Sequence, residues 1–105
     1  MSKEKKAKND DDGKIKLSKP YDFEGVTYTE IDLEPALETL SGKDFAQVKK
    51  EWAAEGNFAV QISTDPVFCA MVACRALGLD RSFAEDLPLK DYTAIQAAVQ
   101  GFLLG

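Results

Sequence analysis

The side chains best suited to acid–base chemistry are two close pairs of carboxylates. Glu34 and Glu38 lie one helical turn apart, and Glu85 and Asp86 are adjacent. Paired carboxylates can act as the general acid and the general base of one reaction. Both pairs fall on segments whose opposite faces are apolar, however, and this pattern is typical of solvated helix faces. We therefore expect neither pair to be catalytic.

The histidine and cysteine content argues against most other active-site chemistry. The chain has no histidine, so it lacks the commonest general base at neutral pH and any Ser–His or Cys–His nucleophile pair. Cys69 and Cys74 lie in a predicted helix, about 140° apart around its axis, where they cannot bridge one another. Two thiols without histidine are also a poor zinc site. We predict two buried cysteines, no metal, no cofactor and no enzymatic activity.

Charge and hydropathy narrow the class of partner. The chain has 105 residues, 45% of them apolar, which suits one compact soluble domain. Positions 1–14 hold five lysines and four acidic residues, which leaves 8 basic and 14 acidic side chains in residues 15–105. Such a surface repels phosphate, so we expect no nucleic-acid partner. No apolar run approaches the ~20 residues of a membrane span, and no apolar export signal follows the first lysines.

Two segments differ sharply in composition. Residues 1–13 are almost entirely charged or polar and predict a disordered tail, whereas residues 14–105 predict a single domain. That domain opens with the alternating Ile15 and Leu17, a strand that Lys19-Pro20 should end. A turn at Glu24-Gly25 then leads into a β-rich segment. These features predict a short hairpin or meander that packs on the helices after it.

Helix signals dominate the rest of the chain. Pro35 suits the first turn of a short helix, Ser41 and Asp44 resemble a capping box, and Asp65 or Thr64 with Pro66 marks another start. Gly78 should end that helix, and Asp80 should cap a further short one. Residues 57–63 alternate like a short strand, but they are too few to decide. The fold class is therefore α+β and mainly α, with four to five helices.

The last helix is the best candidate for a partner-binding surface. Its apolar positions recur at helical spacing, and Leu104 lies off the main stripe. A chain that ends on such an apolar helix predicts docking to another protein, or a longer product that continues from it. The candidate partner-binding residues are Tyr92, Ile95, Val99, Phe102, Leu103 and Leu104.

Several sequence features resemble the phage tail assembly chaperones of long-tailed phages. The resemblance spans Ile15 to Leu104 and is strongest in the last helix. It rests on Ile15-x-Leu17-Ser18-Lys19-Pro20, Phe23-Glu24-Gly25, Thr29-Glu30-Ile31-Asp32-Leu33, the leucine-rich step from Leu37 to Asp44, the helix from Phe68 to Gly78, the short step from Asp80 to Leu87, Leu89-x-Asp91-Tyr92, Ile95, Val99-Gln100 and Phe102-Leu103.

The resemblance implies a function without catalysis. Such a chaperone binds the tape measure protein, helps recruit tail tube (major tail) protein subunits in the cytoplasm of the host bacterium, and is absent from the mature virion. It also implies a possible frameshifted longer form of the chain and a possible homo-oligomer. The alternative is an acidic regulatory adaptor or antitoxin-like domain, whose partner would be a small basic toxin or DNA-binding protein.

Overall fold

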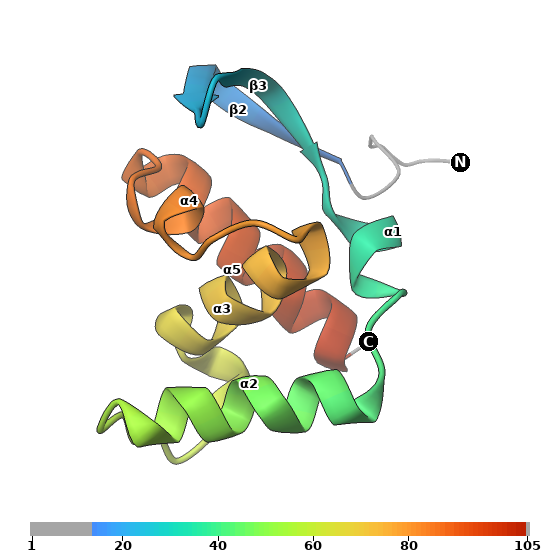
Figure 1. Cartoon of the computed structure of the whole chain (residues 1–105), viewed down its shortest axis with the longest axis vertical. Helices are drawn as coiled ribbons and strands as arrows, with labels where there is room; N and C mark the ends of the chain where they lie inside the picture. Colours follow the sequence, from blue (N-terminus) through green and yellow to red (C-terminus); the bar gives the residue numbers. More distant parts are fainter. Residues whose placement is uncertain (1–13, 105) are drawn as a thin grey trace.

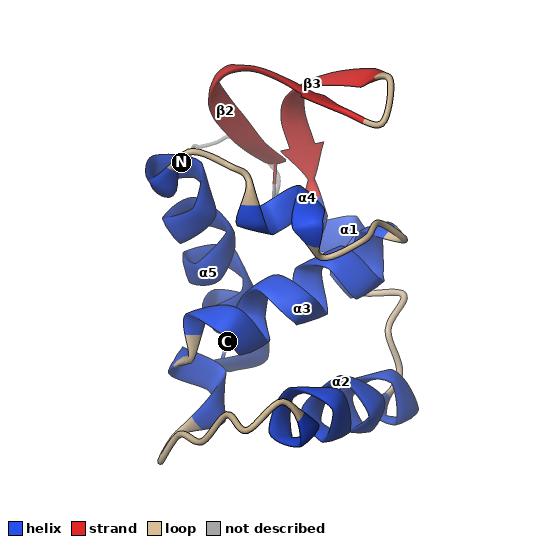
Figure 2. Ribbon diagram, turned by 60° about the vertical axis from the view of Figure 1, so that its left-hand side comes forward, coloured by secondary structure: helices blue, strands red, loops and turns tan. Residues whose placement is uncertain are grey.

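The computed structural model describes residues 14–104, so the predicted disordered tail, residues 1–13, lies outside it. The expected α+β fold, mainly α, is confirmed, with one hairpin and five α-helices in the described residues. The hairpin lies at one end of the helical body and α2 at the other (Figures 1 and 2). The elements are β2 (Lys14–Phe23), β3 (Val26–Asp32), α1 (Leu33–Leu37), α2 (Gly42–Ala54), the 3₁₀ turn η2 (Ile62–Thr64), α3 (Pro66–Leu77), α4 (Ser82–Glu85) and α5 (Leu89–Leu104).

The hairpin forms where its turn residues predict it. Glu24 and Gly25 have φ angles of 50° and 83°, the positive values that a tight two-residue hairpin turn needs. Phe23 pairs with Val26 on either side of that turn, and the strands run antiparallel. Gly25 adopts its positive φ without a steric penalty because it has no Cβ, whereas Glu24 is the one non-glycine residue with positive φ among the described residues.

The prediction that β2 ends at Lys19-Pro20 is wrong. The strand continues to Phe23, and its register shifts between Lys16 and Tyr21. The shift arises because Lys16 pairs with Glu30 and Tyr21 pairs with Tyr28, so residues 17–20 lie opposite the single residue between those partners. Proline has no N–H to give to a ladder, and a bulge accommodates it.

The hairpin packs on the helices through aromatic side chains gathered around Phe83. Phe83 of α4 is fully buried, and the rings of Tyr21, Phe23 and Tyr28 meet it edge to face with centroids 5.1–5.3 Å away. The Tyr21 hydroxyl also donates a hydrogen bond to the Phe83 carbonyl oxygen at 2.8 Å. Edge-to-face pairs of this kind stabilise a contact beyond simple area burial, so the short helix α4 fixes the position of the hairpin.

Helix α3 is the centre of the core. Every residue from Phe68 to Cys74 is buried, and α3 contacts α1, α2, α4, α5 and η2. It starts as predicted, with Asp65 accepting from the Phe68 N–H at 2.9 Å and Pro66 in the first turn. It ends as predicted at Gly78, whose left-handed conformation lets Leu79 N–H reach the Cys74 carbonyl oxygen at 3.0 Å.

The capping box of α2 is confirmed. The Ser41 hydroxyl accepts from the Asp44 N–H, and the Asp44 carboxylate accepts from the Ser41 N–H at 3.0 Å. On the buried side of this helix, Trp52 donates its indole N–H to the Asp65 carboxylate at 2.9 Å. Asp65 therefore caps α3 and also joins α2 to α3.

The possible strand over residues 57–63 does not form. This segment is a loop followed by η2, and the described residues contain only the two-stranded sheet of β2 and β3. Local bonds hold the loop instead: the Asn57 amide donates to the Trp52 carbonyl oxygen at 2.9 Å, and the Thr64 hydroxyl donates to the Gln61 carbonyl oxygen at 2.8 Å. A segment without a strand partner satisfies its backbone locally, whatever its alternation of side chains.

Candidate interaction surface

The carboxylate pairs considered for catalysis lie on exposed surface. Glu34, Glu38, Glu85 and Asp86 are all exposed, and Glu85 forms an ion pair with Arg81 at 3.2 Å. Within residues 14–104, no three acidic or thiol side chains come close enough together to hold a metal ion. These positions match the solvated helix faces that the sequence predicts.

Both cysteines are buried and free, as predicted. The Cys69 thiol lies near the Ser63 carbonyl oxygen at 3.3 Å and can donate to it. Burial raises the pKa of Cys69 to about 11, and it also raises the pKa of Cys74. At neutral pH both thiols are therefore protonated, and a protonated, buried thiol is a poor nucleophile.

One carboxylate is buried, which the sequence did not predict. Asp91 is only 3% exposed, and its carboxylate accepts from the Ser18 backbone N–H at 3.1 Å and from the Ser18 hydroxyl at 3.0 Å. Asp91 lies in the first turn of α5, but its partner lies 73 residues away in the sequence. The one sign of this contact in the sequence is the proline in β2. A bulge in the strand leaves backbone N–H groups without a partner in the sheet, and these groups need other acceptors. Asp91 thus ties the hairpin to α5.

The six predicted partner-binding residues divide between core and surface. Ile95 and Val99 are 1% and 0% exposed, so in this fold they support the helix rather than offer a contact. Tyr92 and Leu103 are half-buried, and the Tyr92 hydroxyl donates to the Pro66 carbonyl oxygen at 3.2 Å. Phe102 and Leu104 are exposed, at 37% and 64%. Partner binding stays a prediction, and the last turns of α5 are the part of the helix open to it.

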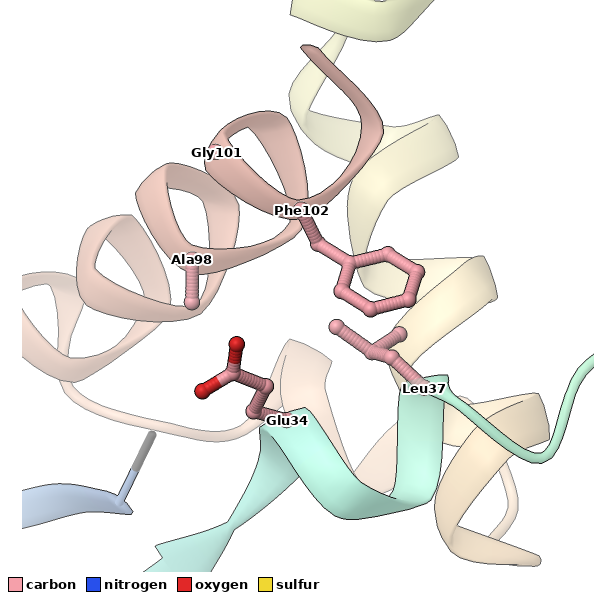
Figure 3. Close-up of a pocket in the computed structure, with 5 residues that line it drawn as sticks. All are labelled: Glu34, Leu37, Ala98, Gly101 and Phe102. Carbon is pink, nitrogen blue, oxygen red and sulfur yellow. The ribbon is translucent and has the colours of Figure 1, made fainter. Parts of the chain in front are cut away.

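A groove lies beside this exposed end of α5, between α5 and α1. Its volume is about 230 Å³, and Figure 3 shows the ring of Phe102 lying over Leu37 while the carboxylate of Glu34 points toward Ala98. The lining residues are Glu34, Leu37, Ala98, Gly101 and Phe102. We call this feature the α1/α5 groove.

The two walls of the α1/α5 groove differ in charge. Residues 92–104 contain no charged side chain, although 30% of the whole chain is charged. The segment from Asp32 to Gly42, which includes α1, carries Asp32, Glu34 and Glu38 and no basic residue. Of these three carboxylates, Glu34 is the one that lines the groove, beside Leu37 of the same helix. The groove therefore has a neutral α5 wall of small and apolar side chains and an α1 wall that carries one carboxylate.

A second exposed apolar site was not predicted. Phe58 and Val60, in the loop before η2, are 86% and 98% exposed. The sequence pattern left a strand and a loop open here, so it did not predict that both side chains lie on the surface. Exposed apolar side chains of this size are typical of contact sites when they cluster.

Comparisons with known proteins identify the family. A family model described as "Phage tail assembly chaperone proteins, E, or 41 or 14" matches residues 14–104. The chain therefore belongs to the phage tail assembly chaperone family, as the resemblance in its sequence indicated. Neither the curated proteins nor the solved structures include a significant match. Across the described residues, every helix is too short or too polar to cross a membrane.

Proposed function

We propose that this chaperone binds the tape measure protein during tail assembly, helps recruit tail tube (major tail) protein subunits around it, and leaves before the virion is complete. The observation that carries this proposal is the exposed apolar end of α5 beside the α1/α5 groove, in a chain of this family. Apolar grooves bind the apolar faces of helices, and membership of this family implies a tape measure protein that is a long helical chain in need of such cover.

The proposed action is binding without catalysis, in the cytoplasm of the host bacterium. Exposed Phe102 and Leu104 would cover apolar side chains of the partner. The formal charge of −5 would keep the complex soluble, because net charge of one sign opposes aggregation. A frameshifted longer form and a homo-oligomer are compatible with this action, since either would multiply the contacts with a long partner.

Co-expression with the tape measure protein of the same phage tests the proposal. We expect the tape measure protein to be insoluble alone, and to become soluble and co-purify when this chain is present. Tail tube protein added to that complex should be retained. An insoluble tape measure protein with no complex would contradict the proposal, and a specific complex with a small basic toxin would favour the adaptor alternative.

A substitution at the end of α5 tests the surface itself. Phe102→Asp places a charge in the apolar contact, so it should remove most of the solubilised tape measure protein. Leu89→Asp is the matched control, because Leu89 is 76% exposed at the opposite end of the same helix. Equal rescue by both variants would exclude the end of α5 as the contact.

A further inference from the structure

We propose that the α1/α5 groove receives an amphipathic helix that places an apolar side chain between Leu37 and Phe102 and a lysine or arginine against Glu34. The inference rests on the proposed function, because the helix would be a segment of the tape measure protein. The inference adds which segments of the tape measure protein are bound, namely those that carry an apolar residue next to a lysine or arginine.

The size of the groove favours a side chain as its occupant. Its volume of about 230 Å³ is below the roughly 300–1,000 Å³ of typical small-molecule sites. The Phe102 ring and the Leu37 side chain form its apolar side (Figure 3). An apolar side chain that enters here is removed from water on several sides at once, which is the main source of binding free energy in such contacts.

The α5 wall of the groove allows a second helix to approach closely. Ala98 and Gly101 line the groove, and Ala94 and Ala97 lie within a turn or two of them on the same helix. A Cβ added at Gly101 would meet open space. Small side chains shorten the distance at which two helices pack, so this wall suits a helix better than an irregular segment.

The α1 wall determines the charge of the occupant. Glu34 and Glu38 are exposed, and no described lysine or arginine forms an ion pair with either. Since residues 92–104 are uncharged, nothing on the opposite wall balances them. Complementary charge selects partners and disfavours like-charged ones, so the occupant should carry a basic residue next to its apolar anchor.

Two other occupants fit these features less well. A second copy of this chain would offer its own α5, whose residues 92–104 carry no charged side chain to meet Glu34. The basic run Lys3 to Lys8 of the same chain would meet the charge, but its only apolar residue is Ala7. A basic amphipathic helix satisfies both walls.

The first test measures binding of peptides tiled along the tape measure protein, each about 25 residues and thus several helical turns long. We expect wild-type protein to bind a subset that shares an apolar residue next to a lysine or arginine. Gly101→Leu fills the groove and should weaken that binding at least about tenfold. Leucine is the better helix former, so loss of binding would not reflect loss of folding. Gly42→Leu, at another open glycine, is the matched control.

The second test exchanges charges. Glu34→Lys should abolish binding of the selected peptide, and the same peptide with its basic residue changed to glutamate should bind the Glu34→Lys protein again. Glu51→Lys, on α2, controls for net charge and should leave binding unchanged.

The outcomes separate this inference from the proposed function. Failure of the wild-type chain to bind any part of the tape measure protein would overturn both. Wild-type binding that survives Gly101→Leu and Glu34→Lys would overturn the groove alone. Selected peptides without a basic residue would overturn the charge rule. Light scattering measures self-association of the chain. If Gly101→Leu abolishes self-association but leaves tape measure binding unchanged, the groove binds a second copy of the chain instead.

Discussion

Asp91 is a buried carboxylate that joins two elements from opposite ends of the described chain. Because a hydrogen bond to a charged group contributes about 1.5–3 kcal/mol in favourable settings, and Asp91 accepts from both the N–H and the hydroxyl of Ser18, we expect Asp91→Ala to lower the free energy of unfolding by at least the contribution of one such bond. Chemical denaturation measures this change. Ser18→Ala removes only the hydroxyl bond and keeps the backbone bond, so its effect should be smaller. An Asp91→Ala protein as stable as wild type would contradict the role of this link.

The buried thiol of Cys69 gives the fold a definite response to alkaline pH. Its pKa rises from 9.0 in an ordinary setting to about 11 in the folded chain. Between these values the folded state keeps a proton that the unfolded state has lost, so this contribution to stability is complete below pH 9 and is lost as pH rises toward 11. Denaturation at pH 8 to 11 should show the decline. Cys69→Ser, which cannot titrate there, should show a shallower decline; an equal slope would exclude Cys69 as a cause.

Gly101 and Gly78 should respond to alanine in opposite directions. Gly101 lies within α5 with open space around it, so Gly101→Ala should stabilise the fold by about 0.5–1 kcal/mol. Gly78 has a φ of 73° at the end of α3, where a Cβ costs about 1–2 kcal/mol. Thermal unfolding of the two variants checks both signs. A destabilised Gly101→Ala protein would show that α5 ends earlier than Leu104 or packs more tightly there.

The helices were predictable where local signals fix them. A capping residue affects only the backbone within a few positions of it, so the sequence alone locates the helix end. The helices begin or end as predicted at Ser41 with Asp44, at Asp65 with Pro66, and at Gly78. Pro20 misled because a bulge can carry a proline through a strand. The alternation in residues 57–63 could not decide between a strand and a loop, because alternation alone supplies no neighbouring strand.

The candidate interaction surface was predictable only in outline. Helical spacing placed Ile95, Val99 and Phe102 on one stripe, but the depth of each depends on α1 and α3, which pack against α5 from distant parts of the sequence. Glu34 was expected on a solvated face, and it is exposed there, yet its position at a groove with Gly101 depends on tertiary packing. No local pattern specifies such a juxtaposition.

At the level of the whole molecule, the loop that holds Phe58 and Val60 allows a test of whether a second surface, besides the end of α5, contributes to the proposed binding of the tape measure protein. Both side chains are almost fully exposed, so Val60→Asp should leave folding within about 0.5 kcal/mol of wild type. If this loop adds to the proposed contact with the tape measure protein, the variant should solubilise less of that protein on co-expression. Full rescue by Val60→Asp would restrict the contact to the end of α5.

The central claim, a transient role in tail assembly, is tested most directly by deleting the gene for this chain from the phage and examining the particles by electron microscopy. We predict that heads form without tails, that the wild-type chain supplied from a plasmid restores the tails, and that mass spectrometry finds no trace of the chain in purified virions. Normal tails in its absence, or stoichiometric amounts of the chain in the virion, would contradict the account.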